Sequence, residues 1–565
     1  MLGADTMERA KSLIHSFRKD EDGSILMLSL LLFLGMTVFG GIAVDLANYE
    51  RTRTTLQSHL DNAVLAAASL SQDLDPEIVV MSYLTSAGLD ASLVDVETST
   101  EEIGGILVGR TVEASLVGGL DTFFFGFFDI HSLGMTIASQ ATERVEDIEI
   151  SLVLDVSGSM DWPTSAGGGG RKIDLLKQAA SDFVDSVLSE AEDGRVSISI
   201  IPYSTKVNAG AALLSQYSVT QEHEYSHCVD FEASDYRNLS ISPSTELQRT
   251  GHFQFQEWSL SDQSKGQWVC RVDPGFEITP LSNSISDLKA QISQLSPEGS
   301  TSIDMGAKWG LALLDPSAQD PVSGLIYAGE VDPAFSGRPH PHGAENNLKV
   351  LVIMTDGKND NEYRLHPDFA EGESPVIRTA SRSGSHRYYS MDVAESGGAH
   401  DGEAPYGEQY FYAIHPFGDD RMWDDDTLMN NPALAKYKAQ IIEDRLTWPE
   451  VWAEMSPVYY GYYLHGRQSN SSGYWQARMW NQWENMHFEI EPGEKDNRLS
   501  DMCAAARSAG IVTYTIGMEV ESSSSLDLLQ DCASTEAHYF DVDGLEINTA
   551  FDMIAASISM LRLTK

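Results

Sequence analysis

Residues 25–44, ILMLSLLLFLGMTVFGGIAV, contain no charged side chain. A helix that rises about 1.5 Å per residue would carry this run across about 30 Å, the thickness of the hydrocarbon core of a bilayer. No small-x-small cleavage pattern follows the run, so we expect a retained single-pass anchor and not a cleaved signal peptide. Four basic residues precede it, whereas only Arg51 and Arg53 follow within the next twenty positions.

The excess of positive charge before the run predicts that the N-terminus lies in the cytoplasm. We therefore expect an inner (cytoplasmic) membrane protein whose remaining residues, about 520 of the 565, are periplasmic or extracellular. Its net charge of −47 repels nucleic acid, which excludes nucleic-acid binding as its function. The apolar fraction of 42% is that of a folded protein.

The four cysteines all fall in the part assigned to the outside, where disulfides persist. Three pairings are open, and two pairs of buried free thiols are the alternative. We predict pairing between sequence neighbours, Cys228 with Cys270 and Cys503 with Cys532.

Residues 46–76 are predicted to continue as a helix, because apolar residues recur every three or four positions until Asp75-Pro76. This helix either lies on its own domain or is a stalk that pairs with other helices, which would make the protein a homo-oligomer. Residues 77–146 contain strand-like runs and predict a small β-rich module. Its aromatic patch, Phe123–Phe128, is too short to span a membrane and is assigned to core or interface packing.

After residue 146 the pattern changes to alternating strands and helices, which predicts an α/β domain with a mostly parallel sheet over 147–565. Two long insertions, about 205–280 and 357–497, interrupt it. Within the second, the stretch Trp448–Trp483 alone holds five of the ten tryptophans of the chain, and we interpret these as the core of the insertion. The expected order is a cytoplasmic tail 1–22, a transmembrane helix 23–45, the stalk 46–76, the module 77–146 and this domain.

Two predicted strands end on carboxylates, and hydroxyls lie beside them. The run ISLVLDVSGSM places Asp155 at the end of a buried strand, and LKVLVIMTDG places Asp356 after another. Ligands of open α/β sheets lie outside the carboxyl ends of the strands. Such an oxygen-only set suits Mg²⁺, with Mn²⁺ or Ca²⁺ as alternatives. The expected metal ligands are Asp155, Ser157, Ser159, Thr301 and Asp356.

This set resembles the metal-ion-dependent adhesion site of von Willebrand factor A domains. That family carries D-x-S-x-S after its first strand, a threonine in a later loop and T-D-G after its fourth strand. The resemblance implies a Rossmann-like fold and a cation that accepts an acidic side chain of a protein partner. Asp155→Ala is expected to abolish metal-dependent binding and to leave the fold intact, because the loop is predicted at the surface of the sheet.

A second resemblance covers the ends of the chain. DGSILMLSLLLFLGMTVFGGIAVDLANYERTRTTLQ, with the tail DNAVLAAASL, resembles the N-terminal segment of TadG-like proteins of the Tad (Flp) pilus-assembly system, and CAAARSAGIVTYTIG resembles their carboxyl end. It implies a non-enzymatic, membrane-anchored protein that acts in pilus assembly or anchoring and in adherence. An envelope adhesion receptor unrelated to pili is the first alternative.

A zinc metalloprotease is an alternative of another class. HEYSH, His223 to His227, matches the H-E-x-x-H pattern of zinc proteases. That pattern needs a helix with an apolar inner face and a third ligand, whereas the flanking sequence here is polar. We therefore favour a surface segment beside a disulfide.

Overall fold

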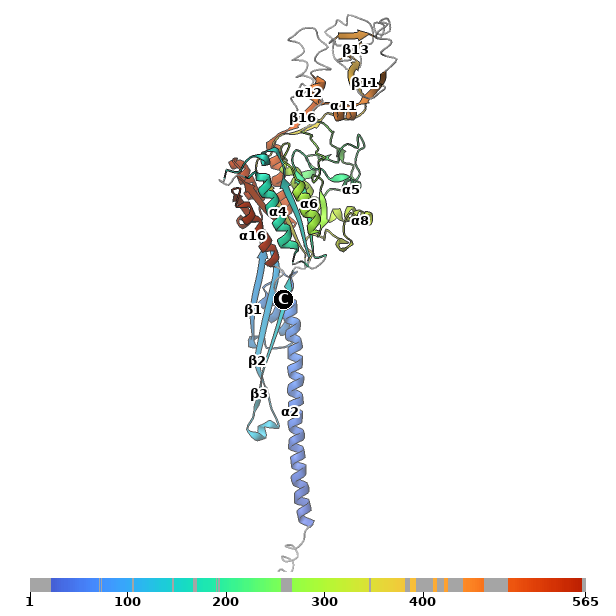
Figure 1. Cartoon of the computed structure of the whole chain (residues 1–565). Coiled ribbons are helices and arrows are strands. Elements are labelled where there is room, and N and C mark those ends of the chain that lie inside the picture. Colours follow the sequence, from blue (N-terminus) through green and yellow to red (C-terminus); the bar gives the residue numbers. More distant parts are fainter. Residues whose placement is uncertain are drawn as a thin grey trace, which may run out of the picture. The chain divides into compact units, whose positions relative to one another are not determined.

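The chain forms two compact units in the computed structural model, one of Met1–Glu101 with Leu107–Arg144 and one of Glu102–Ile106 with Val145–Lys565 (Figure 1). The structure describes residues 22–70, 72, 74–103, 106–144, 147–165, 170–189, 191, 194–255, 267–344, 347–381, 387–392, 410–413, 421–424, 441–461 and 486–560.

The first unit begins with one continuous helix, α2 (Asp22–Ala68). The predicted anchor and stalk are therefore a single element, and it ends before the expected stop at Asp75-Pro76. Among the described residues, this is the one helix long and apolar enough to cross a membrane. A second helix that the sequence pattern did not reveal, α3 (Pro76–Ser86), follows; Asp75 caps it by accepting the backbone N–H of Glu77.

A three-stranded antiparallel sheet completes this unit, in the order β1 (Val94–Ile103), β2 (Ile106–Asp121), β3 (Ser132–Arg144). The carboxyl-terminal turns of α2 bury their apolar stripe against it. This packing fits the interpretation in which the helix lies on its own domain. Pairing of the stalk with other helices, which would make the protein a homo-oligomer, stays a prediction. The shared core contains Leu60, Ala63, Val64, Ala67, Val80, Leu84, Val112, Ala114, Leu116 and Ile137.

Strand β3 runs alongside α2. The Tyr49 hydroxyl donates to the carbonyl of Gly134, and the Gln57 amide donates to the carbonyl of Ala138. Eight residues of helix span about 12 Å and four residues of strand span about 14 Å, so the two elements advance nearly in step. Position along the helix axis can therefore be compared directly with position along the hairpin.

The second unit contains a six-stranded sheet in the order β18-β17-β9-β4-β5-β8. All neighbouring strands are parallel except β5 and β8. This confirms the predicted α/β class. The antiparallel edge strand β8 is not predicted from the sequence, and it begins inside the predicted first insertion, about 205–280. The strands are β4 (Asp147–Asp155), β5 (Val196–Tyr203), β8 (Thr279–Ser282), β9 (Asn347–Thr355), β17 (Val512–Met518) and β18 (Tyr539–Val542).

Helices cover this sheet. Helix α4 packs against α16 and α6 (Figure 1). Helix α14 packs against α7 and α15. Helix α8 and helix α15 were not predicted from the sequence. The bounds are α4 (Lys172–Leu188), α6 (Ile285–Gln294), α7 (Ile303–Ala312), α8 (Gln319–Ala328), α14 (Pro492–Ser508), α15 (Ser523–Cys532) and α16 (Ile547–Met560).

Helix α7 lies unusually close to the sheet. A Cβ atom on Gly306 would lie 2.7 Å from Val153 Cγ1, and one on Gly310 would lie 2.7 Å from Val153 Cγ2. The Ser151 hydroxyl donates to the carbonyl of Gly310 at 2.8 Å. The two glycines thus allow helix and strand to touch, and this contact sets the position of the segment just before α7.

Gly306→Val is expected to destabilise the protein by about 1–3 kcal/mol, because the added methyls would overpack a site with no spare volume. The free energy of unfolding, measured by urea denaturation, tests this. Gly493→Val is the matched control, since Gly493 is also helical and a Cβ atom there would meet nothing within 4 Å. Equal losses in the two variants would contradict the close-packing argument.

The described residues of the first insertion, 205–255 and 267–280, have little regular structure and pack into the main core. It contains α5 (Gly210–Leu214) and the short antiparallel pair β6 (Val229–Asp230) and β7 (Gln248–Arg249). Both predicted disulfides form. Cys228 pairs with Cys270 at a Cα–Cα distance of 5.8 Å, and Cys503 pairs with Cys532 at 5.0 Å.

The second insertion leaves and re-enters the domain through a two-stranded stem, β10 (Glu362–Leu365) and β16 (His487–Ile490). Beyond it, the residues of the insertion that the structure describes form a five-stranded sheet and two short helices. Trp448 and Trp452 are buried there with Tyr460, as expected of a core, and the other tryptophans of the predicted cluster lie outside the described residues. The sheet order is β14 (Arg421–Asp424), β13 (Tyr410–Ala413), β12 (Arg387–Asp392), β11 (Glu373–Ser381), β15 (Ile441–Thr447); the helices are α11 (Trp448–Glu454) and α12 (Pro457–Tyr459).

Candidate functional site

The candidate site lies where the strand order reverses. Strands β4 and β9 are central neighbours, and from them the chain proceeds outward in opposite directions. In open α/β sheets this switch point leaves a crevice beyond the carboxyl ends of the strands. Asp155 ends β4 and Asp356 directly follows β9, so parallel pairing brings the two predicted carboxylates to the same edge.

Asp155 has no exposed surface. Its carboxylate accepts the backbone N–H of Ser157 (2.8 Å), the Thr355 hydroxyl (2.7 Å) and the Tyr203 hydroxyl (3.3 Å). Burial, and then the negative charge of Asp356, raise the pKa of Asp155 to about 6. This carboxylate is therefore held rigidly in a place where its negative charge is unfavourable unless a cation is near.

The burial changes the expectation for Asp155→Ala. The residue is not at the surface of the sheet, and alanine would leave up to three donors unpaired. Each unpaired buried donor costs about 1–3 kcal/mol, so loss of stability would accompany any loss of binding. Asp155→Asn keeps the shape and removes the charge, which makes it the better test.

Two serines link the carboxylates. The hydroxyls of Ser157 and Ser159 are 3.1 Å apart, and the Ser159 hydroxyl donates to Asp356 Oδ1 at 2.6 Å. Between the two serines, the N–H of Gly158 donates to the carbonyl of Gly299 (2.9 Å), and a Cβ atom on Gly158 would lie 3.2 Å from the same oxygen. This turn is therefore packed tightly against the loop that carries Thr301.

Thr301 reaches the same pocket from the loop before α7. Gly299 adopts a φ of +88°, and a Cβ there would lie 2.9 Å from the Thr205 hydroxyl, so this close turn requires glycine. Thr301, Ser159 and Asp356 line one pocket of about 1040 Å³. The structure thus brings the five predicted residues to one edge of the sheet.

Lys172 is a residue of this site that sequence reasoning missed. Its ammonium is buried, donates to Asp356 Oδ2 at 3.0 Å and lies 3.9 Å from Glu519 Oε2. Lys172 is the first residue of α4, where the helix dipole disfavours a positive charge. A lysine at the predicted start of a helix could have indicated this contact, because its positive charge there requires a carboxylate partner nearby.

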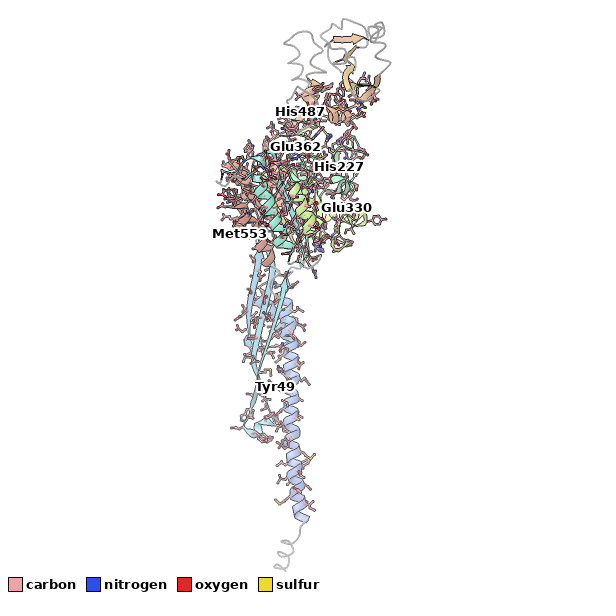
Figure 2. The ribbon with its side chains drawn as sticks, in the orientation of Figure 1. Tyr49, His227, Glu330, Glu362, His487 and Met553 are labelled. Atoms are coloured by element: carbon pink, nitrogen blue, oxygen red, sulfur yellow. A yellow bond between two sulfur atoms is a disulfide. The ribbon has the colours of Figure 1, made fainter. Side chains whose placement is uncertain are left out.

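A buried ion cluster supports the Thr301 loop from the insertion side. Glu362 on the stem pairs with Lys206, with Arg364 Nε (2.7 Å) and with Arg498 (3.3 Å) (Figure 2). Arg498 also lies 3.6 Å from Asp304, near the start of α7. We call Lys206, Asp230, Asp304, Glu362, Arg364, Lys495 and Arg498 the stem ion cluster.

Lys495 connects this cluster to the candidate site. Its fully buried ammonium donates to the carbonyl of Thr301 (3.0 Å), to the Ser302 hydroxyl (2.7 Å) and to the carbonyl of Asp360 (2.6 Å). The backbone N–H of Asp360 donates to the same Thr301 carbonyl. The root of the second insertion is therefore bonded directly to a predicted ligand loop.

The alternative zinc site does not assemble. Residues 221–228 form no helix, and His223 Nε2 lies 2.9 Å from the carbonyl oxygen of Thr250. Within the described residues, no group of three or more His, Cys, Asp or Glu side chains is arranged to hold a metal ion. The candidate site itself has two carboxylates and three hydroxyls, which is a donor set of hard oxygens of the kind that Mg²⁺ takes.

Comparison with known proteins agrees with the N-terminal resemblance. Residues 23–70 match the family model described as "Putative Flp pilus-assembly TadE/G-like". No curated protein matches the chain.

Several solved structures are similar at low identity. The pilus adhesin SpaC from Lactobacillus rhamnosus GG is 11% identical over 82% of this chain and 34% of SpaC, with a TM-score of 0.28. The vWF domain of the type V pili tip protein Mfa5 from Porphyromonas gingivalis is 12% identical over 74% and 98%, with a TM-score of 0.29. Proximal thread matrix protein 1 from the mussel byssus is 11% identical over 73% and 46%, with a TM-score of 0.24.

The chain thus spans about a third of SpaC. Because these TM-scores are low, the fold assignment rests on the strand order, the antiparallel edge strand and the site at the switch point. Residues 23–70 are thus similar to the TadE/G-like pilus-assembly family, and the domain that follows has an α/β fold with a mostly parallel sheet and one antiparallel edge strand.

Proposed function

We propose that the protein is a membrane-anchored, non-enzymatic component of a Tad pilus system that binds a protein partner through a divalent cation. The observation that carries the metal part is the buried Asp155 beside Asp356, two carboxylates that lie at one edge of the sheet with three hydroxyls. Asp155, Ser157, Ser159, Thr301 and Asp356 would hold the ion, with Mg²⁺ preferred over Mn²⁺ or Ca²⁺.

The ligand chemistry favours an acidic partner. Hydroxyls donate less charge than carboxylates, so an ion held by two carboxylates and three hydroxyls stays electrophilic. An acidic side chain of the partner would complete its shell. Lys172 adds a positive charge at Asp356, which supports recognition of an anionic group but lowers the affinity of the site for the free cation.

The charges and cysteines of the chain support the proposed orientation across the membrane. Four basic residues before the apolar run support an N-terminus in the cytoplasm of a cell whose inner membrane holds α2. The two disulfides fit a domain in an oxidising compartment outside. We propose that this domain presents the ion to pilus-assembly partners there; a partner unrelated to pili would make the protein an adhesion receptor instead.

The experiment measures Mg²⁺ binding to the detergent-solubilised full chain by calorimetry. Asp155→Asn is expected to weaken binding on the order of 100-fold or more, because even residues behind the ligands of a metal site contribute about 10–100-fold. Lys172→Met is expected to raise the affinity, since it removes a competing positive charge, a change that misfolding would not produce. Asp161→Asn, whose side chain is 57% exposed, is the control.

Partner capture then tests the function. Wild type should retain components of a pilus system from membranes with Mg²⁺, and should lose them with chelator or with Asp155→Asn. Equal capture in all conditions would mean that assembly does not use the cation. Absence of Mg²⁺ binding by the wild type would overturn the metal site itself.

A further inference from the structure

The tip of the β2–β3 hairpin carries an exposed apolar patch. Phe123 is 76% exposed, Phe127 73%, Phe128 57% and Ile130 43%. Exposed patches of large apolar side chains on a folded domain mark an interaction surface. The sequence assigned Phe123–Phe128 to core or interface packing. The exposure of this patch shows that core packing was wrong, and interface packing stays a prediction.

The tip is fixed to α2 at a defined height. The backbone N–H groups of Phe123, Phe124 and Phe125 donate to the carboxylate of Asp45 at 3.3, 2.7 and 2.9 Å. The ring of Phe124 occupies the space beside Gly41, where a Cβ would lie 2.1 Å from Phe124 Cδ1. Any side chain at position 41 would clash with this ring, so the contact requires glycine there. We call the space beside Gly41 the notch of Phe124.

Asp45 and Gly41 also mark the end of the uncharged run. Asp45 directly follows residue 44, and Gly41 lies three residues, or about 4.5 Å, inside the run. The hairpin tip is thus held level with the end of the membrane-spanning segment. Since the hairpin advances in step with α2, the rest of the sheet lies farther along the helix axis, on the side away from the run.

We propose that this tip is a second membrane contact, in which Phe123, Phe127, Phe128 and Ile130 insert at the boundary between headgroups and acyl chains of the bilayer that α2 spans. The inference rests on the anchor of the proposed function. Phenylalanine and aliphatic side chains on the apolar face of an interfacial segment insert about 5–10 Å into this boundary. Asp129 and His131, which lie 3.3 Å apart, would remain among the headgroups.

The patch selects acyl chains over anionic headgroups. Residues 119–131, GLDTFFFGFFDIH, contain no lysine or arginine. Insertion should therefore not depend on anionic lipid or on salt, unlike that of a basic peripheral helix. With α2 as one contact and the tip as another, the bilayer would fix the tilt of the helix.

The test uses single cysteines on the full chain in phosphatidylcholine liposomes, since all four native cysteines are in disulfides. An environment-sensitive dye at Phe127→Cys should lose its fluorescence when lipids carry a shallow spin-label quencher. A dye at Phe39→Cys, inside the run, should be quenched by a deep quencher. A dye at Glu113→Cys should not be quenched, because eight strand residues, about 27 Å, separate it from Asp121.

The outcomes separate the two hypotheses. An unquenched dye at residue 39 would overturn the anchor and with it the proposed placement. A quenched dye at 39 with a water-exposed dye at 127 would overturn the membrane contact alone. If the dye at residue 127 is shielded from water but is not quenched by lipid, the patch contacts another protein surface, and the proposed contact with the bilayer is wrong.

A matched pair of glycine variants adds a second readout. Gly41→Val fills the notch of Phe124 and is expected to abolish the quenching at residue 127 while residue 39 stays quenched. Gly40→Val should change neither signal, because a Cβ at Gly40 meets nothing within 4 Å. Loss of the 127 signal in both variants would contradict the role of the notch.

Discussion

Glu362→Gln is expected to destabilise the protein by about 3–5 kcal/mol, because it leaves buried cations without their counter-charge. Glu362 and Lys206 are both fully buried, and Arg364 and Arg498 are nearly so. Lys206 would keep Asp230 as a partner at 2.6 Å, but the cluster would carry an uncompensated charge. Urea denaturation of the detergent-solubilised chain at pH 7 measures the loss.

The pKa of Glu362 predicts how the loss of unfolding free energy in Glu362→Gln depends on pH. Burial alone would raise the pKa of Glu362, but Lys206 and Arg364 lower it well below its ordinary value of 4.5. A carboxyl whose folded pKa is depressed contributes stability that is present above its unfolded pKa and is lost as the pH falls toward the folded pKa. The difference between wild type and variant should therefore be full at pH 7 and shrink progressively below about pH 4.5.

The control for this prediction is Glu371→Gln, an exposed carboxylate of the same insertion. It should change the unfolding free energy by less than about 0.5 kcal/mol, as surface substitutions do. A loss at Glu362 that matches this control, or one that does not depend on pH, would contradict the stabilising role of the cluster.

Removal of the Cys228–Cys270 disulfide by the double substitution to alanine is expected to cost about 4 kcal/mol by the chain-entropy relation. The bridge closes a loop with a sequence separation of 42, and the part of this insertion that the structure describes has little regular structure of its own. Asp230, which pairs with Lys206, lies two residues after Cys228, so the stem ion cluster should loosen as well.

Reduction of the wild type separates this effect from that of the substitutions. Dithiothreitol should lower the denaturation midpoint of wild type further than that of the Cys228→Ala, Cys270→Ala variant, which retains only the Cys503–Cys532 bridge. A variant without cysteines should not respond to reductant. If the double variant unfolds at the same urea concentration as oxidised wild type, the bridge does not stabilise the insertion.

The sequence predicted the parts of this fold whose signals are local. The buried residues 350–354 of β9, VLVIM, appear as an uninterrupted apolar run, and the ends of β4 and β9 carry Asp155 and Asp356 in motifs with fixed spacing. The edge strand β8 has four residues and only one of them is buried, so it leaves little trace in a hydrophobic pattern.

What could not be predicted depends on contacts between distant segments. Lys172 meets Asp356 across 184 positions, and Lys495 meets the carbonyl of Thr301 across 194. Neither pairing has a spacing rule, since both follow from how helices α4 and α14 pack on the sheet. The requirement for glycine at position 41 could not be predicted either, because it comes from contact with the ring of Phe124, more than eighty residues later.

The stem of the second insertion has an evolutionary consequence. Leu365 pairs with His487 across the stem, so the two ends of the chain between them lie about 5 Å apart, close enough for a tight turn to join them. Lineages can therefore lengthen, exchange or delete the intervening residues as a cassette without altering the register of any strand in the parallel sheet. The anchor and the parallel sheet can thus be inherited unchanged while the surface of the insertion diversifies.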